Sequence, residues 1–151
     1  MNTKFSYHAS DIMLTFDMVA TCDEARAGVI HTAHGDVPTP VFLPVATQGS
    51  VKTVTPQELR ELGATMLLGN TYHLYMRPGV KTMREAGGLA SFMSWYGPNL
   101  TDSGGFQAFS LGSHVRVTDE GLRFRSHIDG TQHLFTPENV IGYQEGLGAD
   151  I

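Results

Sequence analysis

The chain has 151 residues, of which 41% are hydrophobic and 17% charged, and its formal net charge is −5. This length and balance suit one globular domain. The net negative charge argues against a chain that binds nucleic acid non-specifically over its surface, because phosphate binding needs clustered Lys and Arg. The single cysteine, Cys22, excludes an internal disulfide and any multi-cysteine metal site within the chain.

Apolar residues do not form a membrane-spanning run. No stretch reaches the roughly 18 consecutive apolar residues that a membrane span needs, and the residues after Met1 do not form an apolar signal core. A reducing cytoplasm is the simplest location for a chain with one cysteine. We therefore expect a cytoplasmic protein without a membrane partner.

The first 39 residues are expected to form an antiparallel preface to the main fold. Residues 15–21 alternate apolar and polar side chains, as a half-buried strand does, with Phe16 and Met18 on the buried face. A second strand is predicted over 27–33. A turn at 34–36 should follow it, and regular pairing should end at the next prolines, Pro38 and Pro40.

His31 and His34 lie three residues apart, a spacing that on a helix could hold a metal ion. On a strand followed by glycine, with no third ligand nearby, the same spacing favours two histidines with solvent-exposed tips. We therefore expect no metal site in this chain.

Residues 41–69 predict a strand, a helix and a strand in succession. Residues 41–46 are continuously apolar, as in a strand buried on both faces of a parallel sheet. Thr55 is a helix N-cap residue whose capping box is completed by Glu58, and the helix should stop at Gly63. Residues 65–69 form the second buried strand, so the three elements make a βαβ unit.

A further helix is predicted over 78–86, where Val80, Met83 and Ala86 recur at helical spacing before Gly87-Gly88. An aromatic-rich cluster follows, made up of Phe92, Met93, Trp95 and Tyr96. Such a cluster could stack RNA bases. Because no basic residue interleaves it, it is more typical of a core or of a subunit contact.

The most informative stretch is 99–107. An extended 99–101 would bring Asp102 to the rim of a sheet, and Gly104-Gly105 would let the backbone turn sharply and approach a flat ligand. Phe106 could then stack on that ligand. Taken by themselves, residues 102–105 are more simply an ordinary Asx turn, in which the aspartate bonds nearby backbone amides.

Antiparallel strands are predicted beyond residue 112. Segments 115–118 and 122–125 flank one turn, and Asp129-Gly130 predicts a type I′ hairpin between 126–128 and 132–134. We expect a β-hairpin insertion on the rim of the main fold.

Three arginines in this insertion fall on alternate positions and form the one local basic concentration: Arg116, Arg123 and Arg125. They could face phosphate or simply be solvated. Thr136-Pro137-Glu138 then starts a helix that should run to Gly146, and residues 148–151 should begin another strand.

Several runs, in their order along the chain, resemble the tRNA-guanine transglycosylases. They are PVFLPV at 40–45, LGNTYHLYMRPG at 68–79, DSGGFQ at 102–107, FRSHIDG at 124–130 and GADI at 148–151. The resemblance covers the chain from about Arg26 onward but only the first part of the family pattern. Leu43 and Ala46 are small departures, since the family usually has methionine and glycine there.

The resemblance implies an α/β fold, a (β/α)₈ TIM barrel. Residues 40–151 would supply its first strands and helices, and residues 1–39 the antiparallel preface. Such a barrel needs about 250 residues, so 1–151 would be the N-terminal part of a single transglycosylase domain. Alone it should be poorly folded, because an open part-barrel leaves sheet edges unpaired.

Catalytic groups in a barrel come from the C-terminal ends of strands, so Asn70 and Asp102 would share one rim. The resemblance implies that Asp102 is the catalytic acid/base and base-recognition residue, oriented by Asn70 and Thr71. An ionised carboxylate has two acceptor oxygens that match two adjacent N–H donors of guanine. The rest of the base would meet Ser103, Gly104, Gly105 and Phe106.

The activity implied is exchange of guanine at the wobble position of the tRNA anticodon for a deazaguanine base in queuosine biosynthesis. Retained stereochemistry at the ribose is most simply achieved by two displacements, which require a nucleophilic carboxylate as well as an acid/base group. The resemblance places that nucleophile and a structural zinc site beyond Ile151, and it implies a homodimer. The motifs favour the bacterial queuosine precursor over queuine as incoming base.

Two other classes stay open. A non-catalytic transglycosylase paralogue, acting as a partner subunit, would keep the fold but could dispense with Asp102. An unrelated barrel hydrolase would need its own nucleophile or metal ligands, and neither Ser110, Ser113 nor the scattered histidines form such a constellation.

Overall fold

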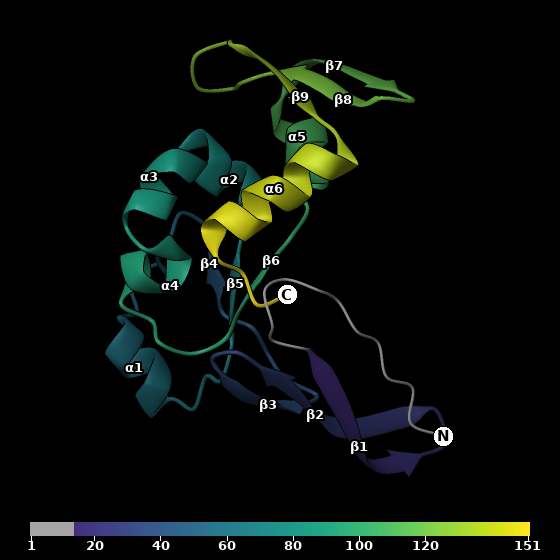
Figure 1. The fold of residues 1–151 in the computed structure, drawn as a ribbon, viewed down its shortest axis with the longest axis vertical. Helices are drawn as coiled ribbons and strands as arrows, with labels where there is room; N and C mark the ends of the chain where they lie inside the picture. The colour runs from purple at the N-terminus through teal and green to yellow at the C-terminus, as the bar shows by residue number, and fades with distance from the viewer. Residues whose placement is uncertain (1–13) are drawn as a thin grey trace.

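The structure, a computed structural model, describes residues 14–151. These residues form an α/β arrangement in which the strands make three separate three-stranded sheets. Figure 1 shows two antiparallel sheets at opposite ends of the molecule, with a small parallel sheet and most of the helices between them.

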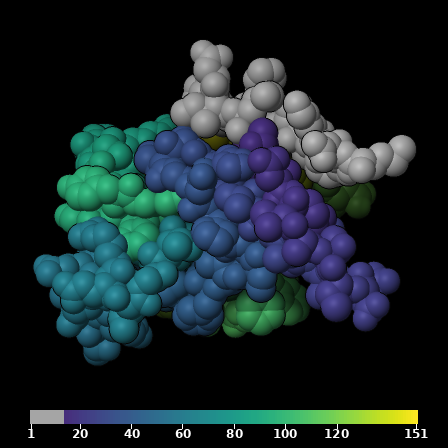
Figure 2. Space-filling model, turned by 90° about the horizontal axis from the view of Figure 1, so that it is seen from below, coloured from purple at the N-terminus to yellow at the C-terminus, as the bar shows by residue number. Residues whose placement is uncertain are grey.

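The predicted antiparallel preface is present in the described residues, and residues 1–13 lie outside them. It consists of β1 (Thr15–Cys22), β2 (Ala25–Thr32) and β3 (Gly35–Thr39), in the order β1-β2-β3. Seen from below, these strands lie beside the segment leading to the first helix (Figure 2). The third strand was not predicted. Pro38 does not end pairing, because it lies opposite Val29 on an edge strand, where a missing N–H is tolerated.

The expected half-burial of β1 is wrong. Phe16 is 43% exposed, and almost the whole strand faces solvent. Two features explain this: β1 is an edge strand, and its register shifts between Met18 and Ala20, which interrupts the alternation of faces.

The central sheet is parallel, with the order β4 (Val45–Ala46), β5 (Leu67–Gly69) and β6 (Asn99–Thr101). The predicted βαβ unit is therefore confirmed, with α1 (Pro56–Glu61) between β4 and β5. Its capping box is present as well: the Thr55 N–H donates to Glu58 at 2.7 Å, and the Glu58 N–H donates to Thr55 Oγ1 at 3.2 Å.

The strand expected over 41–46 is reduced to two residues and is not buried on both faces. Phe42 is 82% exposed. Within residues 14–151, β4 pairs only with β5, so one of its edges and much of the preceding segment meet solvent. The described residues thus contain a three-stranded parallel sheet and no closed barrel.

The remaining helices are α2 (Thr71–Met76), α3 (Val80–Glu85), α4 (Gly88–Met93), α5 (Gly105–Leu111) and α6 (Pro137–Leu147). Helices α3 and α6 were predicted. Helices α2, α4 and α5 were not predicted. Gly87-Gly88 does not simply end a helix, since Gly88 opens α4.

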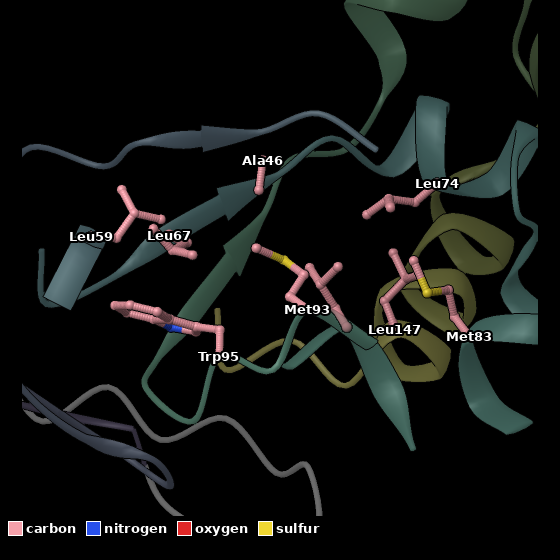
Figure 3. Close-up of a cluster of buried hydrophobic side chains, with 9 residues drawn as sticks. Ala46, Leu59, Leu67, Leu74, Met83, Met93, Trp95 and Leu147 are labelled. Atoms are coloured by element: carbon pink, nitrogen blue, oxygen red, sulfur yellow. The ribbon is translucent and has the colours of Figure 1, made fainter. Parts of the chain in front are cut away.

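The main hydrophobic core lies between the parallel sheet and its helices. It gathers Ala46, Leu59, Leu67, Leu74, Met83, Leu89, Met93, Trp95 and Leu147 (Figure 3). The aromatic-rich cluster divides accordingly: Met93 and Trp95 are buried in this core, whereas Phe92 and Tyr96 are exposed.

The predicted β insertion is a third sheet, made of β7 (Ser113–Thr118), β8 (Gly121–Arg125) and β9 (Gln132–Phe135). The type I′ turn is wrong. Residues 126–131 form a longer connection in which Ser126 Oγ accepts from the Ile128 N–H at 3.1 Å and Asp129 accepts from the Thr131 N–H at 3.1 Å. These side chains accept hydrogen bonds from backbone N–H groups that, in a hairpin with a two-residue turn, would bond to the opposite strand.

The last three residues are hydrogen-bonded along β6. Residues 149–151 follow α6 without assigned strand structure, yet the Thr101 N–H donates to the Ile151 carbonyl at 2.9 Å and the Asp150 N–H to the Asn99 carbonyl at 3.0 Å. The Ile151 N–H also donates to the Asn99 carbonyl at 3.4 Å, and the two bonds of Ile151 to β6 follow the pattern of a parallel ladder, as expected of the beginning of a further strand.

Candidate active site

Two neighbouring parallel strands bring Asn70 and Asp102 to one edge of the sheet. Gly69, the last residue of β5, is paired in register with Thr101, the last residue of β6. The residues that follow, Asn70 and Asp102, therefore leave the sheet side by side, although 32 positions separate them in the sequence. The shared rim expected from the sequence is present.

The Asp102 carboxylate accepts hydrogen bonds from four donors. Oδ2 accepts from the Asn70 side-chain amide at 2.7 Å and from that of Gln107 at 3.4 Å. Oδ1 accepts from the backbone N–H of Thr71 at 2.8 Å and of Gly104 at 3.2 Å. The Gly104 contact is the Asx turn expected locally, and the Asn70 and Thr71 contacts go beyond it.

Asp102 caps α2 from another strand. Asn70 occupies the N-cap position of α2 but makes no side-chain cap bond, because its amide is turned toward Asp102. The first N–H of the helix, on Thr71, is instead accepted by Asp102. Free N–H groups at a helix start favour a negative charge, so the carboxylate and the helix hold each other in place.

Gly104 is required by two independent constraints. Its φ of 68° lies in the left-handed region, where most residues are strained. A Cβ at this position would also lie 2.8 Å from the backbone nitrogen of Tyr72. The turn after Asp102 therefore packs directly against the start of α2, which keeps the carboxylate close to Asn70 and Thr71.

The first turn of α2 is buried and polar. Thr71 is fully buried, and its Oγ1 has no hydrogen-bond partner among residues 14–151. Tyr72 is also fully buried, and its hydroxyl lies 2.6 Å from Nδ1 of His127 in the β8–β9 connection. Burial raises the pKa of Tyr72. The phenol therefore stays protonated, and its short hydrogen bond with the imidazole tethers α2 to the third sheet.

His73 lies beside this tether. Burial lowers its pKa below the ordinary 6.5, the nearby His127 lowers it further, and the charge of Asp102 acts in the opposite direction. Its ring packs edge-on to Tyr72, with 5.4 Å between the ring centroids. Tyr72 and His73 are thus held in ring contacts with each other and with His127.

The remaining predicted site residues are more open. Ser103 is exposed, and its Oγ accepts from the Gly105 N–H at 3.3 Å. Phe106, on the first turn of α5, is 76% exposed, so its ring has a free face. Gln107 was not singled out from the sequence as a binding residue. Helix α5, which was not predicted, brings its side-chain amide to the carboxylate.

Two surface hollows lie elsewhere. The larger, of about 660 Å³, is lined mainly by apolar residues around β4 and α1, including Phe42 and Leu62. A smaller one of about 310 Å³ is lined by Arg60, Trp95 and neighbouring residues. Residues that precede β5 or β6 line both hollows, so the hollows lie toward the N-terminal ends of the parallel strands, opposite Asp102.

The described residues do not fit a zinc site. Cys22 is exposed on β1, and residues 14–151 contain no group of three or more His, Cys, Asp or Glu side chains placed to hold a metal ion. His31 is instead bonded to Asp36 at 2.7 Å and His34 to Asp150 at 2.7 Å. No helix in the described range is long and apolar enough to cross a membrane.

Comparison with known proteins identifies the family. A family model described as Queuine tRNA-ribosyltransferase matches residues 21–151. The chain belongs to the queuine tRNA-ribosyltransferase family. This confirms the resemblance to tRNA-guanine transglycosylases, and the match includes both sides of the Asp102 rim.

Curated relatives carry the same name. A queuine tRNA-ribosyltransferase of Desulforudis audaxviator is 62% identical over 127 residues, covering 84% of this chain and 34% of the relative. That of Pelotomaculum thermopropionicum is 60% identical over 127 residues, which again cover 84% of this chain and 34% of the relative. That of Nitratidesulfovibrio vulgaris is 55% identical over 137 residues, covering 91% of the chain and 36% of the relative. The chain thus spans about a third of the length of these family members.

Proposed function

We propose that this chain supplies the base-recognition and acid/base part of a tRNA-guanine transglycosylase, within a TIM barrel completed by sequence beyond Ile151. The enzyme exchanges guanine at the wobble position of a tRNA anticodon for a deazaguanine base in queuosine biosynthesis. The observation that carries the proposal is the Asp102 carboxylate, held at a strand end by Asn70, Thr71 and Gly104.

The carboxylate suits a guanine edge. Guanine has adjacent N–H donors, and Asp102 has two acceptor oxygens, one of which keeps only a long 3.4 Å contact to Gln107 beside its bond to Asn70. Swapping such a weak internal donor for a donor on the base costs little. The exposed ring of Phe106 covers one face of the base, and Ser103 and the Gly104-Gly105 backbone border the rest.

The exchange needs two displacements at ribose C1′. In the first, a carboxylate bonds to C1′ and the bond from C1′ to guanine breaks; in the second, the incoming base displaces that carboxylate. Asp102 gives a proton to the departing guanine in the first step and regains one from the incoming base in the second, so the protons balance over both steps. The nucleophile and the zinc ligands, three cysteines and a histidine, come from sequence beyond Ile151. The enzyme works as a homodimer in the cytoplasm.

Asp102→Asn tests the proposal in a protein that carries this chain together with the rest of the family's length. The change keeps the side chain's shape but turns one acceptor into a donor that faces guanine's own donors. A site built to pair a polar edge can lose a factor of about 10⁴ when the pairing is broken, or roughly 5 kcal/mol of transition-state stabilisation. Exchange of radiolabelled guanine into tRNA is the measurement.

The matched control is Asp23→Asn, the same chemical change on an exposed turn of the preface, which should leave exchange unaltered. If Asp102→Asn keeps exchange within about tenfold of wild type, a barrier change near 1.4 kcal/mol, then Asp102 is only a turn residue. A wild-type protein that binds tRNA without exchanging guanine would instead be the non-catalytic paralogue.

A further inference from the structure

The sheet β7–β9 has one buried and one basic face. Phe124 and Phe135 on its inner face are almost fully buried against Tyr72 and α6. On β8, Arg123 and Arg125 flank Phe124, and alternation along a strand places both on the opposite face. Arg116 on β7 is paired in register with Arg123, so it shares that outer face.

These arginines are exposed and incompletely neutralised. Arg123 forms an ion pair with Glu120, whereas Arg116 and Arg125 have no carboxylate partner within residues 14–151. Like charges placed directly opposite each other on a sheet destabilise it. The cross-strand pair of Arg116 and Arg123 is therefore an arrangement that an anionic ligand would stabilise.

Acidic residues near this sheet lie in its connections and not on its strands. Asp119 and Glu120 form the β7–β8 turn, and Asp129 in the β8–β9 connection accepts bonds from Thr131. By register, the outer face otherwise carries small, polar or aliphatic residues: Ser113, Thr118, Gln132 and Leu134. A flat basic face without an aromatic platform suits sugar-phosphate backbone and not unstacked bases.

The basic face is joined firmly to the Asp102 rim. Helix α5 begins at Gly105, just after Asp102, and β7 begins two residues after α5 ends. Gly112 makes this junction tight: a Cβ there would lie 2.4 Å from the Ala108 carbonyl oxygen and 3.1 Å from Cβ of Phe124. Figure 1 shows β7–β9 beyond α5, at the end of the molecule toward which β5 and β6 run.

We propose that the outer face of β7–β9, through Arg116, Arg123 and Arg125, binds backbone phosphates of the RNA whose nucleotide enters the Asp102 site. Arginine suits this role, because its planar guanidinium binds phosphate oxygens through two parallel hydrogen bonds. The inference rests on the proposed function and adds to it an RNA contact surface within this chain.

The test uses Arg116→Gln/Arg125→Gln in a protein of the relatives' full length. Equilibrium binding of tRNA is measured between 50 and 300 mM salt by fluorescence anisotropy. Each phosphate contact contributes about 0.7 to 0.9 to the slope of log K against log salt, so the double variant should have a slope shallower by roughly 1.5. The KM for tRNA in guanine exchange should rise in parallel.

Two further variants separate the face from charge and folding effects. Arg26→Gln/Lys81→Gln removes the same charge from β2 and α3 and should keep the wild-type slope and exchange rate. Arg116→Lys/Arg125→Lys keeps the charge and should restore most of the slope while losing the paired hydrogen bonds.

An unchanged slope in Arg116→Gln/Arg125→Gln would overturn the inference, and so would an equal loss of slope in the Arg26 and Lys81 control. A lowered unfolding temperature with an unchanged slope would mean that the face packs on the rest of the protein. These outcomes are distinct from failure of the proposed function, in which the wild-type protein itself does not exchange guanine.

Discussion

The two antiparallel sheets have the same strand order and differ in what packs against them. Sheet β7–β9 buries Phe124 and Phe135 in an aromatic cluster with Tyr72. Sheet β1–β3 buries Val37 but leaves Phe16 and Val19 exposed. The comparison teaches that strand pairing alone does not make a sheet part of the core. Contacts from its inner face to helices do, and those contacts attach β7–β9 to the helix that holds Asp102.

The preface is attached differently, through a polar contact. His34, in the β2–β3 turn, lies 2.7 Å from Oδ1 of Asp150, whose side chain is only 2% exposed. Oδ2 of Asp150 accepts from the backbone N–H of Asn99, the first residue of β6, at 2.9 Å. One buried carboxylate therefore links the preface to the start of β6, the strand that Asp102 follows.

The largest expected effect on stability separates the two sheets directly. Phe124→Ala should lower the free energy of unfolding by about 3–5 kcal/mol, because it opens a cavity among well-packed rings. Phe16→Ala, the same change on exposed β1, should cost less than about 1 kcal/mol. Urea unfolding of the two variants, made like the variants below in a protein of the relatives' full length, measures both values. Equal losses would show that the sheets contribute alike and would contradict the comparison.

An intermediate effect should follow from the polar link. Asp150→Ala leaves the Asn99 N–H buried without an acceptor, which costs about 1–3 kcal/mol. His34→Ala takes the partner from Oδ1 of Asp150, but the His34 side chain is 47% exposed, so water can replace the lost contact and the cost should be smaller. The two are compared by thermal unfolding. A His34 variant as damaging as the Asp150 variant would mean that the preface, and not the start of β6, depends on this link.

The smallest effects concern pH and have opposite signs in the two regions. The pKa of His73, beside the β7–β9 connection, is lowered mainly by burial, so the unfolded chain binds more protons below about pH 6.5. Because of His73, the stability of the folded protein therefore falls as pH falls through that value. Hydrogen bonds to Asp36 and Asp17 raise the pKa of His31 in the preface. The stability that these contacts of His31 add is present below about pH 6.5 and is lost as pH rises through the raised pKa.

Unfolding temperatures measured from pH 5 to 8 distinguish the two histidines. Relative to wild type, His73→Gln should gain stability toward low pH, because it removes a group that resists protonation. His31→Gln should lose stability toward low pH, because it removes a favourable charged contact. If both variants shift in the same direction with pH, one of the two assignments is wrong.

Features that depend on neighbouring residues could be predicted from the sequence. Thr55 and Glu58 form the expected capping box, and α6 begins at Pro137 after the Thr136 N-cap, since all the partners lie within four positions. The turn after Asp102 was likewise predictable, because Gly104 adopts the left-handed conformation that glycine favours. The ordered motifs also identified the family, although the shared rim of Asn70 and Asp102 was expected only through that resemblance.

Tertiary structure decided which surfaces are buried and which distant groups meet. The same apolar pattern led to an exposed Phe16 and a buried Phe124, because burial depends on what packs against a strand and not on the strand itself. Residues 41–46 are apolar throughout, yet they form a two-residue strand with one partner. Of the four hydrogen bonds to Asp102, those from Gly104 and Gln107 are local. The register of two parallel strands is what brings the donors of Asn70 and Thr71 to the same carboxylate.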